Sequence, residues 1–184
     1  MERAALSFVG EAETAAGELQ AAAAHLERSL RLCEPSRVPD YSFELGLARH
    51  LQGRISEAAE LYKKAIALRP SVPGAQNNLG VMLVMEGKPA KAVSYFQAAI
   101  RFDPLRSAEP YFNLAKVVEQ LPGQADKARA LLQQALHLQP GIAQHEQSLL
   151  WRLRQQKPGN VGFTTELRLM WPYGYPVPGS RAGY

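Results

Sequence analysis

The sequence predicts an all-α protein, built as a right-handed superhelical solenoid of antiparallel helix pairs. Three observations predict this class. A set of columns recurs every 34 residues, glycines fall where the first helix of each pair should close, and prolines fall where the second should stop. The residues that end the helices and the 34-residue period therefore indicate the same architecture of stacked helix pairs.

The recurring columns align over two copies without a gap. One copy holds Leu45, Gly46, Gly53, Ala58, Tyr62, Ala65 and Pro70, and the next holds Leu79, Gly80, Gly87, Ala92, Phe96, Ala99 and Pro104. A third copy, Leu114, Ala115, Ala128, Leu132, Ala135 and Pro140, needs two single insertions at helix ends, where length changes are tolerated. A degenerate copy, Gly10, Gly17, Ala22, Leu26 and Ser29, precedes them, as expected of a terminal repeat.

This order of Leu-Gly, Gly, Ala, aromatic, Ala and Pro resembles the tetratricopeptide repeat (TPR), a helix-turn-helix unit. The resemblance implies a TPR-like solenoid that holds other polypeptides. It divides the chain into a degenerate repeat (1–38), three repeats (39–72, 73–106 and 107–141), a capping helix (142–157) and an extended tail (158–184). Helices are predicted over 3–16, 18–33, 40–52, 55–68, 74–86, 89–102, 108–121, 124–138 and 142–156.

Each column also has a physical reason of its own. Gly46 and Gly80 fall where the two helices of a pair approach closely, and the alanines Ala58 and Ala92 serve the same contact from the second helix. The aromatic residue four positions later fills the space beside it. A leucine at Gly80 should therefore overpack the pair.

The tail differs sharply in composition from the repeats. Residues 161–170 alternate in hydrophobicity, which predicts one extended strand that needs a partner for its backbone. The residues expected to dock are Phe163, Leu167, Leu169, Trp171, Tyr173 and Tyr175. They are expected to pack on the chain's own array or to exchange between two protomers of a homodimer; the alternative is a strand added to a partner's sheet. Trp151, on the capping helix, either packs beneath the tail or forms an exposed anchor.

Charge and composition limit the partners and the cellular compartment that we expect. The net charge is +4, but most basic residues, such as Arg49, Arg54 and Lys63, are interleaved with acidic ones and are expected on a solvated face. The cluster Arg152, Arg154 and Lys157 complements a helix dipole, and no nucleic-acid partner is expected. No apolar run resembles a signal peptide or a membrane span, and Cys33 is the single cysteine, which predicts a cytoplasmic protein.

The inventory of reactive groups predicts no enzyme, no metal and no cofactor. His25, His50, His137 and His145 are scattered, and no phosphate loop or nucleophile motif occurs. Glu57 and Glu60 share one helix face, which is more typical of a solvated surface than of a catalytic pair.

A binding surface is instead expected on the first helix of each pair. In repeats of this kind, including those of the O-linked N-acetylglucosamine transferases, an asparagine before the Leu-Gly or Leu-Ala pair grips a peptide backbone. Asn78 and Asn113 hold this position and Glu44 replaces it in the preceding copy. Alternatively, each asparagine bonds a neighbouring helix or caps a turn.

The carboxylate clamp of related co-chaperones is disfavoured. Phe43, Leu47 and Glu109 stand where the clamp has lysines and an asparagine, and only Asn78 fits. The lining, which also includes Val84, suits a mixed apolar ligand with backbone contacts. The predicted peptide-binding residues are Phe43, Leu47, Leu51, Asn78, Val81, Met85, Phe112, Asn113 and Lys116.

The leading functional hypothesis is a non-catalytic scaffold or adaptor that binds a peptide segment of a protein partner. The alternative is an accessory or targeting module of a larger catalytic or secretion complex, joined through the tail. Removal of residues 158–184 discriminates between them, because partners lost with the tail favour the alternative.

Overall fold

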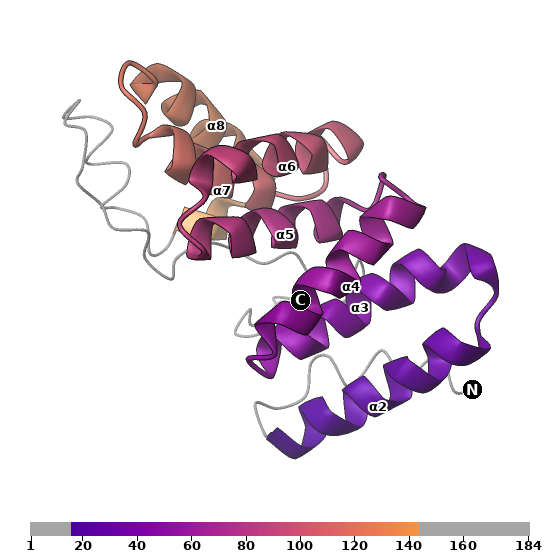
Figure 1. The fold of residues 1–184 in the computed structure, drawn as a ribbon. Helices are drawn as coiled ribbons and strands as arrows, with labels where there is room; N and C mark the ends of the chain where they lie inside the picture. Colours follow the sequence, from indigo (N-terminus) through magenta and orange to yellow (C-terminus); the bar gives the residue numbers. More distant parts are fainter. Residues whose placement is uncertain (1–15, 144–184) are drawn as a thin grey trace. The chain divides into compact units, whose positions relative to one another are not determined.

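A computed structural model describes residues 16–143 of the chain (Figure 1). Within that range the chain is helical and forms no strand. The described residues group into two compact units, residues 16–75 and residues 76–143, and the boundary falls in the first turn of α5. The helices are α2 (Ala16–Leu32), α3 (Val38–Leu51), α4 (Ile55–Leu68), α5 (Pro73–Met85), α6 (Pro89–Phe102), α7 (Glu109–Val118) and α8 (Ala125–Leu138), with the 3-10 helices η1 (Pro35–Arg37) and η2 (Pro140–Ala143).

Most helix ends lie within two residues of the predicted ones, and α4 and α6 match at both ends. The helix α7 differs most, because it ends at Val118 rather than at residue 121. The amides of Gln120 and Leu121 bond carbonyls three residues back, and Pro122 disfavours helical geometry in the residue before it. The predicted break at Gly17 is also wrong, since α2 runs through it.

Several predicted features lie outside the described residues. They are the helix over residues 3–15, the continuation of the capping helix over 144–156 and the strand over 161–170. Residues 142 and 143, where the capping helix was expected to begin, belong to η2.

Left-handed glycines close the first helix of each pair, as the sequence predicted. Gly53 has φ 75° and Gly87 has φ 73°, a region that other residues rarely adopt. The residue after each glycine donates its amide to a carbonyl five positions back: Arg54 to Arg49 at 2.8 Å and Lys88 to Leu83 at 2.8 Å. This pattern satisfies helix-end carbonyls and turns the chain into the second helix.

The two helices of a pair meet at a glycine on one side and an aromatic ring on the other. A Cβ atom built on Gly46 would lie 2.7 Å from the ring of Tyr62, and one built on Gly80 would lie 2.7 Å from the ring of Phe96. Both rings are fully buried. The predicted close approach is therefore confirmed in both units, in α3 against α4 and in α5 against α6.

First and second helices differ in how they are buried. The second helices α4, α6 and α8 each bury one stripe at helical spacing, namely Ala58, Tyr62 and Ala65, then Ala92, Phe96 and Ala99, then Ala128, Leu132 and Ala135. In contrast, residues 74–82 of α5 and residues 112–119 of α7 are buried without interruption. Because successive residues point about 100° apart, a run of this length leaves no side of the helix exposed.

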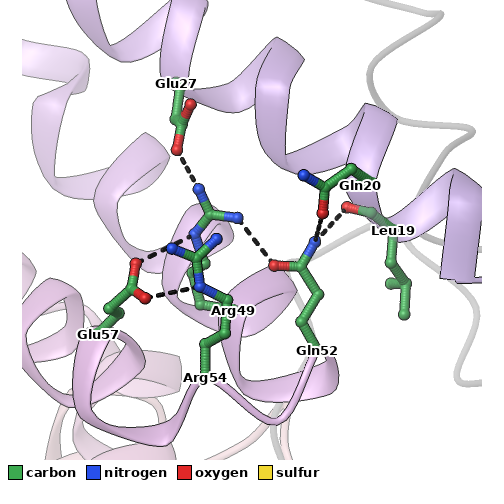
Figure 2. Close-up of polar contacts among 7 residues, drawn as sticks. All are labelled: Leu19, Gln20, Glu27, Arg49, Gln52, Arg54 and Glu57. Carbon is green, nitrogen blue, oxygen red and sulfur yellow. Dashed lines mark hydrogen bonds and ion pairs between the residues drawn. The ribbon is translucent and has the colours of Figure 1, made fainter.

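Unit 1, residues 16–75, is held together by a buried arginine (Figure 2). Arg49 of α3 is 6% exposed and forms ion pairs with Glu27 of α2 and Glu57 of α4. It also donates to Gln52 at 2.8 Å, and Gln52 donates to the Leu19 carbonyl of α2 at 2.9 Å. The prediction that Arg49 lies on a solvated face is therefore wrong, because this residue is buried and joins three helices. A buried charge is stable only when it is paired, so Arg49 requires these partners.

Replacement of Gly80 by leucine tests the helix-pair contact. The side chain would collide with the Phe96 ring, so we expect the free energy of unfolding to fall by about 1 to 3 kcal/mol. The control is Gln97→Leu, an exposed site on α6 of the same unit, which should change stability by less than about 0.5 kcal/mol. Urea denaturation of both variants measures the difference, and equal stabilities would contradict the contact.

Candidate peptide-binding surface

In unit 1, two of the three predicted lining residues lie in the interior. Phe43 is 6% exposed, and its ring stands 6.1 Å from that of Tyr62. A Cβ atom on Gly74 would lie 2.3 Å from the Phe43 ring, so the glycine makes room for it. Leu47 is buried as well, whereas Leu51 is 40% exposed at the end of α3. Peptide contact by these residues stays a prediction, and of the three only Leu51 is exposed.

In unit 2, residues 76–143, the predicted residues lie on α5 and α7. Asn78, Val81, Phe112, Asn113 and Lys116 are all buried, and Met85 is 58% exposed at the end of α5. Their binding role stays a prediction too. The structure brings the two asparagines into one hydrogen-bonded group.

A chain of three amides links α5 to α7. Asn113 Nδ2 donates to Asn77 Oδ1 at 2.9 Å, and Asn77 Nδ2 donates to Asn78 Oδ1 at 3.1 Å. All three side chains have no exposed surface. Asn113 therefore bonds the neighbouring helix α5, and peptide binding by Asn78 and Asn113 stays a prediction.

Asn77, the centre of this group, is absent from the residues predicted from sequence. The sequence contained a signal for it, because Asn77 stands in the column that holds Phe43 in the preceding repeat and Phe112 in the next. An amide in an otherwise aromatic and buried column indicates a required hydrogen bond.

Charged side chains flank the amides on α7. Lys116 is 7% exposed, and its Nζ lies 5.8 Å from the centroid of the Phe112 ring, within range of a cation–π interaction. Glu119, the residue that caps α7, is 6% exposed. The buried polar and charged residues of α5, α7 and the α7 cap are Gln76, Asn77, Asn78, Asn113, Lys116 and Glu119, and we refer to this set as the polar cluster of unit 2.

Glu44 holds in unit 1 the repeat position that Asn78 and Asn113 hold in their own repeats. It is half-buried on α3, and burial raises its pKa from 4.5 to about 7, against a smaller lowering by the charge of Arg37. A carboxyl group with this pKa is substantially protonated near neutral pH. A protonated carboxyl both donates and accepts hydrogen bonds, as an amide does.

The remaining predicted residues lie either outside the described part of the chain or at its surface. The docking residues Phe163, Leu167, Leu169, Trp171, Tyr173 and Tyr175 lie outside the described residues, as do Trp151, Arg152, Arg154 and Lys157. Glu57 and Glu60 form surface ion pairs, with Arg54 at 2.6 Å and with Lys63 at 2.7 Å. Among residues 16–143, no group of His, Cys, Asp and Glu could hold a metal ion, and no helix is long and apolar enough to cross a membrane.

Two family models described as tetratricopeptide repeat match the chain, one over residues 2–71 and the other over residues 43–107. The chain belongs to the tetratricopeptide-repeat family. The predicted fold class, an all-α TPR-like solenoid of helix pairs, is confirmed, and the handedness of its superhelix stays a prediction. The TPR repeats place the chain among protein-interaction scaffolds.

Solved structures share the fold of this TPR chain at low sequence identity. A structure of YrrB, described as a TPR protein with an unusual peptide-binding site, has a TM-score of 0.58 at 20% identity and covers 78% of this chain and 72% of its own. MamA (41-end) from Desulfovibrio magneticus RS-1 has a TM-score of 0.60 at 22% identity and covers 77% of this chain and 78% of its own.

Curated relatives are much longer than this TPR chain. The human Protein O-mannosyl-transferase TMTC3 is 29% identical over 135 residues, which is 73% of this chain and 14% of that protein. The mouse protein of the same name is 32% identical over 87 residues, 47% of this chain and 9% of that protein. The chain therefore spans only a small part of these relatives.

A double-mutant cycle tests the amide chain. Asn77→Ala and Asn113→Ala each remove one end of the bond between α5 and α7, so their effects on the free energy of unfolding should be non-additive by about 1 kcal/mol. The control pairs Asn77→Ala with Ser94→Ala, an exposed site on α6, for which additivity is expected. Additive losses in the first cycle would show that the two amides do not interact.

The raised pKa of Glu44 predicts a pH-dependent stability. Because the folded pKa exceeds the unfolded value, the folded chain binds more protons between pH 4.5 and about 7. The free energy of unfolding should therefore fall as the pH rises through that window, by up to about 3 kcal/mol. Glu44→Gln should abolish this fall.

Urea denaturation of the wild type and of Glu44→Gln across this pH range measures the effect. Burial lowers the pKa of His50, so the free energy of unfolding falls as the pH falls below 6.5 and this histidine is protonated. Both proteins retain His50, so this contribution is the same in each. The difference between them isolates Glu44. A difference that stays constant with pH would contradict the raised pKa.

Proposed function

We propose that the chain is a non-catalytic adaptor that binds an extended polypeptide segment of a partner along the first helices of its repeats. In unit 2 these are α5 and α7. The observation that carries the proposal is the polar cluster. Of the ten buried polar or charged residues in the described part of the chain, six belong to it.

The chemistry of the cluster suits a peptide backbone. Each residue of an extended chain presents one amide donor and one carbonyl acceptor, and an asparagine side chain can satisfy both at once. A buried polar group without a hydrogen bond costs about 1 to 3 kcal/mol, and the bonds among Asn77, Asn78 and Asn113 keep these amides in place on α5 and α7. Val81 and Val84 of α5 belong to the hydrophobic core of unit 2, and Met85 at the end of the same helix is the exposed apolar residue that the side chains of the segment can contact.

A second candidate is an accessory or targeting module of a larger catalytic assembly. The similarity to TMTC3, a protein named as a transferase, favours it, because most of this chain matches a small part of that relative. The two proposals differ in what recognises the partner. In the adaptor it is the α5–α7 face, and in the accessory module it is the C-terminal tail.

Peptides selected from a displayed random library against the full chain provide the test. We expect Asn78→Ala to weaken a selected peptide about fivefold, the equivalent of one hydrogen bond of about 1 kcal/mol. Met85→Asp should weaken it as well, because Met85 is the exposed apolar residue at the end of this face. Isothermal titration with each variant measures both effects.

The matched control is Leu105→Asp, which changes an equally apolar residue that is 74% exposed but lies outside α5 and α7. It should leave the affinity unchanged. Phe43→Asp is unsuitable, because Phe43 is packed against Gly74 and its loss would damage unit 1. Affinities that respond to Leu105→Asp and not to Asn78→Ala or Met85→Asp would place the binding site elsewhere.

A further inference from the structure

The first helices of unit 2, α5 and α7, are buried over most of their length. Residues 112–119 of α7 are buried in an unbroken run of more than two turns. Three neighbours of α7 are identified: α6 and α8 pack along it, and α5 reaches it through the bond from Asn113 to Asn77. A surface open for binding would instead leave one side of the helix exposed.

The α5–α7 face carries buried amides and a buried cation besides the apolar residues that these helices contribute to the core of unit 2. It combines the amides of Asn78 and Asn113 with the buried cation of Lys116 and the apolar Val81. Such a face is suited to an extended chain, whose backbone needs hydrogen bonds and whose side chains need apolar contact.

Sequence and length favour the C-terminal segment as what covers this face. The described structure ends at Ala143 in η2, which packs against α8 of the same unit, and 41 residues follow it. Even residues 158–184 alone can extend up to about 90 Å, whereas α7, with 10 residues, is about 15 Å long. The segment before Ala16 is shorter, with 15 residues, and holds a single aromatic residue, Phe8.

The segment also carries the matching chemistry. Residues 158–184 hold five aromatic residues, and Trp171, Tyr173 and Tyr175 alternate with prolines and a glycine. Buried tyrosine hydroxyls and tryptophan indoles require hydrogen-bond partners, which amides supply. Proline favours an extended backbone that a groove can bind at low entropic cost.

We propose that residues 161–175 of this chain occupy the α5–α7 face as an intramolecular ligand, and that partners of this face present extended segments rich in aromatic residues. The inference rests on the adaptor function proposed above and identifies its partner class. A partner binds by displacing the chain's own segment, so affinity for partners is lower than the face alone would give.

Photo-cross-linking in the full chain tests the proposal. Tyr173 is replaced by benzoylphenylalanine, the protein is irradiated at low concentration, and mass spectrometry maps the adducts. We expect adducts within one chain on peptides that contain residues 73–85 or 109–118, and their loss when Trp171→Ser is added. Gln97, which is exposed on α6 of the same unit, carries the same probe as a control and should give no adducts on α5 or α7.

The outcomes separate this inference from the proposed function. Adducts on other helices, or none, overturn the inference, while peptide binding that depends on Asn78 would still support the adaptor. Adducts on α5 or α7 that join isotopically heavy and light copies overturn the intramolecular arrangement in favour of exchange between protomers. Intramolecular adducts that a selected peptide abolishes support both proposals.

Discussion

The close approach of the two helices in each pair is the constraint on which the rest of the structure depends. In both units a glycine on the first helix faces an aromatic ring on the second, and any Cβ atom at that glycine would overlap the ring. Helix axes this close bring the Ala stripes of α4 and α6 into full burial. In unit 2 both helices of a pair supply apolar packing, since Val81 and Phe112 of the first helices share one core with Phe96 of a second helix. The polar groups of α5 and α7 are therefore buried beside that core.

The first helices of the two units make different kinds of buried polar contact. In unit 1 a single buried arginine gathers carboxylates from two other helices, and such a charge stabilises only while its partners remain in place. In unit 2 uncharged amides connect α5 to α7. An amide costs less to bury than a charge and can bond to a backbone as well as to a neighbouring side chain, which is why the site proposals rest on unit 2.

Glu44 shows how one repeat position can change its chemistry with its surroundings. The corresponding residues in later repeats are amides, and burial makes this carboxyl group hold its proton to an unusually high pH. A carboxyl group that is neutral near pH 7 can share the hydrogen-bonding character of the amides while keeping the ability to ionise. The repeat thus tolerates an acidic residue at a position otherwise occupied by asparagine.

The sequence by itself determined the repeat length, most helix ends and the residues at the pair contacts, because these depend on local backbone preferences and on spacings of one helical turn. Gly53, Gly87, Gly46 and Gly80 were all interpretable in this way. Only the tertiary structure decided which polar residues are buried and with whom they pair. The partners of Arg49 and Asn77 lie on helices distant in sequence. The environment of a side chain depends on all the elements that pack around it, and a local sequence pattern does not contain that information.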